Sequence, residues 1–223
     1  EGAEDLLELI AEELKQRRFA EAVRLEHGAH SNPWMVKFLK EELELSDEDV
    51  YEAKGLLDYK SLKGLTQLNM PHLKYNHWEP RIPQLIKENP GSIFNVIGKQ
   101  DMLVHFPYES FTTTVEKFVT EAAEDPDVLA IKMTLYRMGD NNPLVHALIR
   151  AADQGKQVVC IVELKARFDE QRNIFWAQKM EKAGIHIVYG VVGFKTHCKT
   201  TLVLRREGRN ITAYGHIGSG NYN

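Results

Sequence analysis

The chain has 223 residues, of which 43% are hydrophobic and 27% charged, with a net charge of −4 and two cysteines. This near-average apolar fraction excludes intrinsic disorder and collagen-like repeats, and no uncharged apolar run reaches the roughly 18 residues of a membrane-spanning helix. Two cysteines cannot staple a chain of this length, so the fold must rest on a hydrophobic core, and their scarcity favours a reducing, cytoplasmic location.

The first 60 residues differ in charge from the remainder. They hold 16 acidic and 8 basic residues, a net charge of −8, whereas the rest of the chain carries +4. Hydrophobic periodicity predicts a small α+β unit here, which we expect to belong to a domain spanning residues 1–79. Its predicted elements are a helix, a strand, a second helix and a short strand, over 4–17, 19–25, 32–45 and 50–54.

A proline-rich stretch separates this unit from the remainder of the chain. Four of the eight prolines in the chain lie between residues 71 and 92. Because helix interiors and central strands tolerate proline badly, we place a connector here. The second domain is then expected to span residues 80–223.

The second domain has a regular alternation of elements. Buried-strand patterns alternate with capped amphipathic helices, which is the β-α-β-α-β signature of a parallel sheet. A final pair of strands, joined by a polar turn, reads as a β-hairpin. The fold class is therefore α/β, a mixed sheet flanked by helices. In chain order we predict helix 110–125, strand 128–136, helix 144–154, strand 157–164, helix 169–183, strand 185–190 and hairpin strands 198–206 and 211–217.

One topological assumption gathers many cations at one edge of this sheet. Parallel strands place their carboxyl ends along a common edge, where α/β proteins bind ligands. If the strand starting near His197 runs antiparallel to them, its first residues lie at that same edge. The predicted rim consists of Arg137, Lys165, Arg167, Lys195, His197, Lys199, His216 and Asn221.

The rim suits phosphoryl chemistry. His197 and Lys199 are two residues apart on a predicted strand and so face the same side, with Cys198 facing the core. A histidine beside cations has a lowered tendency to protonate, which keeps the imidazole nucleophilic. Arginine and lysine can neutralise phosphoryl oxygens, so attack by the histidine would give a phosphohistidine.

The same residues also have purely structural interpretations. Arg137 and Arg167 could form salt bridges at strand ends, with Glu163 or Asp169 as partners. Lys199 could be a solvated hairpin lysine, and His216 and Asn221 could serve only turn hydrogen bonds. Cys160 and Cys198 read as small buried hydrophobes.

The pattern His197-x-Lys199 with Gly218-Ser219-x-Asn221 resembles the signature of the phospholipase D superfamily. The resemblance implies a phospholipase D-like fold. Leu204 stands where that superfamily usually has aspartate, which counts against phosphodiester hydrolysis.

Longer blocks resemble the polyphosphate kinases, which extend inorganic polyphosphate from ATP. Weaker similarity through residues 19–26, 45–51 and 72–75 resembles the end of that family's head domain. The main blocks are HFPYESF (105–111), AAEDPDVLAIKMTLYR (122–137), GKQVVCIVELKARFDE (155–170), AGIHIVYGVVGFKTHCK (183–199) and YGHIGSGNYN (214–223).

This second resemblance implies roles for individual residues. His197 matches the histidine that becomes phosphorylated, with Lys199 stabilising phosphate. Arg137 and Arg167 match a magnesium–phosphate site, where we interpret them as phosphate clamps beside Mg²⁺, because a guanidinium is a poor metal ligand. His216 matches a second family histidine of less clear role. Lys165 and Asn221 complete the phosphate rim.

The implied activity is reversible transfer of the terminal phosphoryl group of ATP to polyphosphate, in a cytoplasmic homo-oligomer, with peripheral membrane association left open. We expect the chain to be a fragment holding half of an active site, inactive alone, with no nucleic-acid partner. Two other functions stay open: a phospholipase D-like phosphodiesterase or nuclease half-site, and a non-catalytic polyphosphate-binding module.

Overall fold

The computed structural model describes residues 3–16, 19–139, 141–164, 166, 169–191 and 194–222, and only the backbone of residues 3–7. The chain divides into two compact units, Glu13–His77 and Glu1–Glu12 with Trp78–Asn223. The domain limits expected from the sequence, 1–79 and 80–223, stay a prediction, because a division by spatial contacts does not define family domains. Throughout the described ranges, every helix is too short or too polar to span a bilayer.

The smaller unit holds a two-stranded parallel sheet. Strands β1 (Leu25–Gly28) and β2 (Val50–Ala53) pair in parallel, with Leu25 opposite Val50. Helix α2 (Pro33–Glu42) joins them and is capped by Asn32, whose side chain accepts the Trp34 N–H. Helix α1 (Ala3–Gln16) precedes this sheet in the chain, and the 3₁₀ segments Asp47–Asp49, Tyr59–Gln67 and Pro71–Leu73 complete the N-terminal part.

One predicted element in this unit is wrong. A strand was expected over 19–25, but β1 only begins at Leu25. Phe19 and Val23, which set the apparent alternation, are exposed. An alternating pattern becomes a strand only when a neighbour pairs with it, and β2 pairs with residues 25–28 instead.

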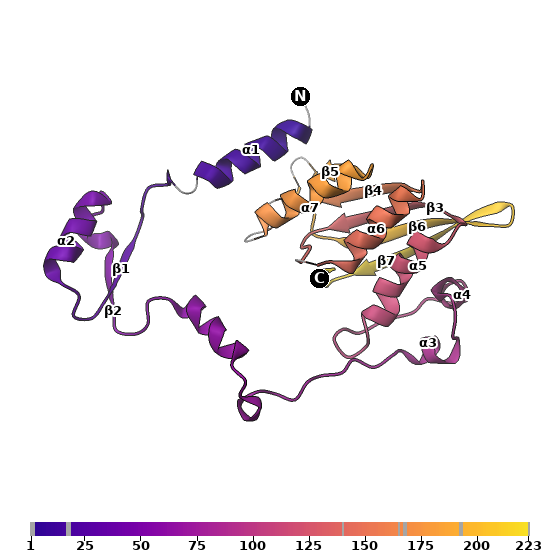
Figure 1. Cartoon of the computed structure of the whole chain (residues 1–223), viewed down its shortest axis with the longest axis horizontal. Helices are drawn as coiled ribbons and strands as arrows, with labels where there is room; N and C mark the ends of the chain where they lie inside the picture. Colours follow the sequence, from indigo (N-terminus) through magenta and orange to yellow (C-terminus); the bar gives the residue numbers. More distant parts are fainter. Residues whose placement is uncertain are drawn as a thin grey trace. The chain divides into compact units, whose positions relative to one another are not determined.

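The larger unit is built on a mixed five-stranded sheet with strand order β5-β4-β3-β6-β7 in the described residues (Figure 1). Strands β3, β4 and β5 are parallel, β6 runs antiparallel to β3, and β7 runs antiparallel to β6. The predicted mixed α/β sheet with a terminal hairpin is confirmed. The strands are β3 (Val128–Leu135), β4 (Gln157–Val162), β5 (His186–Tyr189), β6 (Lys199–Glu207) and β7 (Asn210–Gly218).

Three helices lie across one face of this sheet in Figure 1: α5 (Lys117–Glu124), α6 (Pro143–Asp153) and α7 (Glu170–Lys182). Helix α6 starts where Asn142 accepts the N–H groups of Leu144 and Val145. Gly155 and Gly184 follow α6 and α7 with positive φ, a conformation that favours glycine after a helix. The short helices α3 (Gln84–Glu88) and α4 (Ile93–Ile97) and a π-helical turn (Thr112–Glu116) precede α5.

The core lies between these helices and the sheet. Each large apolar side chain removed from water here stabilises the fold by roughly 1.5–3 kcal/mol. Fully buried members include Ile131, Leu135, Leu144, Leu148, Val162, Met180 and Val203. This core holds the strand ends at fixed positions.

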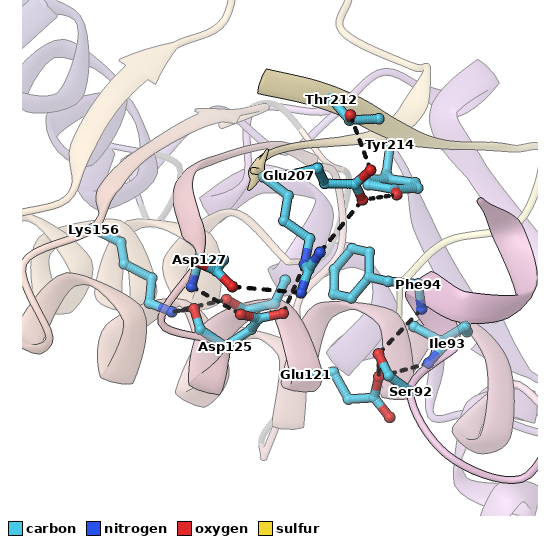
Figure 2. Close-up of polar contacts among 12 residues, drawn as sticks. Ser92, Ile93, Phe94, Glu121, Asp125, Asp127, Lys156, Glu207, Thr212 and Tyr214 are labelled. Atoms are coloured by element: carbon cyan, nitrogen blue, oxygen red, sulfur yellow. Dashed lines mark hydrogen bonds and ion pairs between the residues drawn. The ribbon is translucent and has the colours of Figure 1, made fainter. Parts of the chain in front are cut away.

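A charged network fixes the edge of the sheet where β6 ends (Figure 2). Arg205 Nε donates to Asp125 Oδ2 at 2.8 Å, and its Nη1 donates to Glu207 Oε1 at 3.3 Å. The guanidinium also lies 5.3 Å from the centre of the Phe94 ring. The Tyr214 hydroxyl donates to Glu207, so the network joins both hairpin strands to the segment before β3.

The network shifts the titration of its members. Burial raises the pKa of Asp125, but hydrogen bonds from Arg205 and from the Asp127 N–H outweigh it and hold the pKa below 3.8. Burial and the bond to Glu207 raise the pKa of Tyr214 to about 12. Nearby, Glu121 accepts the Ser92 hydroxyl and the Ile93 N–H, which fastens the start of α4 to α5 (Figure 2).

Replacing Arg205 with alanine should loosen the hairpin. The substitution leaves the largely buried Asp125 carboxylate without its guanidinium, which costs roughly 1–3 kcal/mol of local stability. We expect amide hydrogen exchange across residues 199–218 to accelerate at least about fivefold, measured by mass spectrometry on the intact protein. Arg209→Ala, in the exposed turn, is the matched control and should leave exchange unchanged; equal effects of the two variants would contradict the network's role.

The difference in amide exchange between the unaltered protein and Arg205→Ala should disappear in acid. The pKa of Asp125 is lowered by folding, so its contribution is complete above 3.8 and is lost as the pH falls through the folded-state pKa. Exchange rates of the protein and of Arg205→Ala, once corrected for the intrinsic pH dependence of amide exchange, should therefore converge below pH 3.8. A constant difference down to pH 2 would refute this linkage.

Candidate functional site

The expected convergence of strand ends is observed. β6 starts beside the end of β3, with Met133 opposite Thr201 in antiparallel register. The Thr134 hydroxyl donates to the Cys198 carbonyl at 2.8 Å and accepts the Thr200 N–H at 2.9 Å. The segment that carries His197 is therefore fastened to the carboxyl end of β3.

The centre of the site is an aromatic ring that the sequence analysis did not identify. Tyr136 directly follows β3, and the His197 ring meets its ring at 5.0 Å between centroids and 73° between planes. The Lys199 ammonium lies 4.9 Å from the ring centroid, the Lys195 ammonium 5.4 Å, and the Arg137 guanidinium carbon 5.7 Å. We call these five residues the Tyr136 cluster.

Lys199 is buried, with 2% of its surface exposed, so its description as a solvated hairpin lysine is wrong. Its ammonium donates to the His197 carbonyl at 2.7 Å. No carboxylate among the described residues pairs with it. A buried ammonium without a counter-ion is costly, so an anionic ligand at this position would be strongly favoured.

The His197 side chain is exposed, beside this buried cation. Cys198 is also exposed, so its expected burial is wrong. The reason is that the buried face of β6 carries Lys199, Thr201 and Val203, so the preceding residue, Cys198, lies on the opposite and more exposed side. Cys160 is buried as predicted, and burial raises the pKa of its thiol to about 12.

Arg137 has a carboxylate partner. One guanidinium nitrogen, Nη1, donates to Asp169, which also accepts from Arg172 at 2.7 Å. The strand-end ion pair considered as an alternative is therefore present. The other donors of the Arg137 guanidinium make no hydrogen bond to a described residue, so the side chain can still bind an anion.

Buried polar groups hold this arrangement from behind. Asn173 of α7 is fully buried, and its Nδ2 donates to the Tyr136 carbonyl at 2.8 Å and to the Glu163 carbonyl at 2.9 Å. The Glu163 carboxylate accepts the Thr196 N–H at 2.9 Å. Sequence reasoning missed Asn173, although an asparagine amid the apolar positions of a helix is a signal worth following.

His216 belongs to a second cluster. Its Nδ1 lies 2.8 Å from the Tyr222 hydroxyl, which also accepts the Thr201 hydroxyl at 3.2 Å. The Tyr222 hydroxyl that accepts from Thr201 still has its own proton to donate to Nδ1, and burial lowers the pKa of His216. Asn142, the cap of α6, donates to the Tyr222 carbonyl at 2.5 Å.

The predicted rim therefore separates into two parts. In the portion of the chain that the structure describes, no hydrogen bond or ring contact joins His216 to His197. His216, Asn221 and Tyr222 instead line a cavity of about 600 Å³ whose other wall is the segment 102–107. Asn221 Oδ1 is buried there and has no hydrogen-bond partner among the residues that the structure describes. Lys165 and Arg167, two further predicted rim residues, lie outside the described residues.

The donor set of the site suits phosphate and does not suit a protein-held metal ion. The described residues contain no group of three or more His, Cys, Asp or Glu side chains that could bind a metal. Ammonium and guanidinium groups cannot donate electron pairs to Mg²⁺. They do match the oxygens of a phosphoryl group in charge and hydrogen-bonding sense.

Comparisons with known proteins also indicate a protein related to enzymes of phosphoryl transfer. Residues 92–223 match the family model "Polyphosphate kinase C-terminal domain 1", and residues 1–65 match "Polyphosphate kinase middle domain". Curated proteins named polyphosphate kinase from Mycolicibacterium gilvum and Mycobacterium leprae are each 52% identical over 222 residues, which is 99% of this chain. The chain spans 30% of the length of these relatives.

A solved structure is also similar. The crystal structure of polyphosphate kinase from Porphyromonas gingivalis superposes with a TM-score of 0.72 at 29% sequence identity. The match covers 90% of this chain and 30% of that one. The larger part of each relative therefore has no counterpart in these 223 residues.

The titration of His216 tests the second cluster. Its pKa should lie below 6.5, because burial disfavours the charged ring. The unfolded chain then binds more protons than the folded one, so the His216 contribution to stability falls as the pH drops below 6.5. Nitrogen NMR with labelled histidine should show a neutral ring at pH 7 with the proton on Nε2, and Tyr222→Phe should weaken that tautomer preference. A charged ring at pH 7 would contradict this arrangement.

Proposed function

The chain belongs to the polyphosphate kinase family, and from that membership we propose that it carries the phosphoryl-accepting site of an enzyme that moves the terminal phosphoryl group of ATP onto inorganic polyphosphate. One observation carries the proposal: an exposed imidazole, His197, stands beside a buried ammonium, Lys199, that no carboxylate of the described residues neutralises. In such a pair, the imidazole can act as the nucleophile, and the ammonium favours binding of an anionic phosphoryl group.

The reaction would proceed in two displacements at phosphorus. A ring nitrogen of His197 attacks the terminal phosphorus, the P–N bond forms, and the P–O bond to ADP breaks with its electrons left on ADP. An oxygen at the end of a polyphosphate chain then attacks the same phosphorus, and the histidine nitrogen leaves. The two steps together break one phosphoanhydride bond and form another, so the overall reaction is reversible.

The cations of the Tyr136 cluster would supply electrostatic stabilisation. Phosphoryl transfer needs positioning and neutralisation of the oxygens more than covalent chemistry from the protein. Lys199 and Lys195 act as point charges, and Arg137 offers the planar donors that remain beside its bond to Asp169. Arg167, as the family resemblance implies, and Lys165, as a cation of the predicted rim, are proposed to complete the clamp.

Mg²⁺ is proposed to arrive with the nucleotide. The described side chains do not form a magnesium cage, and Mg²⁺ commonly stays bound to substrate phosphates and water. His216 and Asn221 are assigned to the wall of the cavity, because His216 does not touch the His197 ring in the described structure. A homo-oligomeric state and a cytoplasmic location remain parts of this proposal.

Replacing His197 tests the covalent step. In the complete enzyme, His197→Ala should abolish an acid-labile, base-stable label taken up from terminally labelled ATP, because no nucleophile remains. His186→Ala, which removes an exposed histidine from β5, is the matched control and should retain full labelling. A full-strength label on the His197→Ala protein would overturn the assignment.

The isolated chain should lack synthase activity. Its relatives are more than three times as long, and the family resemblance places a second half of the site beyond these residues. Incubation of the 223-residue chain with ATP and primer polyphosphate should give no chain extension. Extension by this chain alone would contradict the half-site proposal, whereas turnover of a simple phosphodiester without ATP would favour a phospholipase D-like hydrolase.

A further inference from the structure

We propose that Tyr136 is a positioning residue for phosphoryl transfer: the face and edge of its ring, and not its hydroxyl, hold the His197 imidazole among the cations of the site. The proposal deepens the proposed function and rests on it for its kinetic test. Its geometric test is independent of activity.

The first argument is how His197 is held. Its ring meets the Tyr136 ring at 5.0 Å and 73°, an edge-to-face geometry that aromatic rings favour. No described side chain makes a hydrogen bond to the imidazole. Within the described structure, the ring contact is therefore the interaction that limits rotation of the nucleophile.

The second argument is electrostatic. Lys195, Lys199 and Arg137 lie within 5.7 Å of one ring centroid, where their positive charges repel one another. The negative face of an aromatic ring attracts cations, so the Tyr136 ring offsets part of this repulsion without adding a negative charge. A carboxylate in the same place would pair with the lysines and compete with the phosphoryl group.

The third argument is rigidity. Tyr136 follows β3 directly, and its carbonyl accepts a hydrogen bond from the fully buried Asn173. The next residue, Arg137, is held by Asp169. The backbone of Tyr136 and the side chain of Arg137 are therefore both held in place. A ring that positions another side chain needs such a fixed backbone.

The hydroxyl has no comparable function. No described residue forms a hydrogen bond with the hydroxyl oxygen of Tyr136. Phenylalanine should therefore replace tyrosine here, whereas leucine keeps apolar bulk but removes the ring. This difference separates a ring-specific role from simple packing.

The kinetic test measures single-turnover labelling of His197 by saturating terminally labelled ATP in the complete enzyme. Tyr136→Phe should retain the rate within about twofold, and Tyr136→Leu should slow it by about 10- to 100-fold, the cost of a misplaced reactive group. Phe118→Leu, which removes a buried ring in edge-to-face contact with Phe94, is the control for lost stability. It should lower the melting temperature at least as much as Tyr136→Leu and leave the labelling rate unchanged.

The geometric test uses histidine carrying ¹³C in the imidazole. The His197 ring protons should show a ring-current displacement that Tyr136→Phe retains and Tyr136→Leu abolishes, with the signals assigned by their loss in His197→Ala. Labelling at the wild-type rate in Tyr136→Leu, or equal slowing in Tyr136→Phe, would overturn the proposal. Absence of His197 labelling in the unaltered protein would instead overturn the proposed function, and the ring-current result would then decide the positioning claim alone.

Discussion

The antiparallel pairing of β6 with β3 is the constraint on which the site depends. If β6 were parallel to β3, its last residues, and not its first, would lie at this edge. Because β6 enters here, its first residues meet the residues that follow β3. The Thr134 hydroxyl reinforces that meeting by bonding to backbone groups on both sides of Lys199. At the other end of β6, Arg205 ties the hairpin to the segment before β3.

This topology produces a site in which a positive charge is buried although burial disfavours the charged form. Burial removes the hydration of Lys199, and among the described residues its ammonium has a carbonyl oxygen and an aromatic face as partners. A carboxylate partner would make the ammonium more stable and less able to bind phosphate. Asp169 pairs with Arg137 and Arg172 at the margin, so the negative charge lies beside the cluster and the centre stays cationic.

Buried amides connect the scaffold to this chemistry. Asn173 joins the ends of β3 and β4 from within α7, and Asn142 both caps α6 and holds the Tyr222 carbonyl. Tyr222 in turn contacts His216. Helices α6 and α7, which cover the sheet, therefore also order loops at the functional edge, because buried polar groups must find partners and these loops offer backbone carbonyls.

The sequence by itself determined the order and type of the elements of the larger unit from residue 110 onward, including the antiparallel hairpin, and it placed His197, Arg137 and Lys199 near one edge of the sheet. It could do so because hydrophobic period, helix caps and turn residues are local signals. It did not predict the short helices α3 and α4. Tertiary structure alone decided that Tyr136 lies at the centre, that Lys199 is buried, that Cys198 is exposed, and that residues 19–24 form no strand. It also separated His216 from His197. These outcomes depend on which distant segment covers a side chain or pairs with a backbone, and periodicity along one segment does not specify that partner.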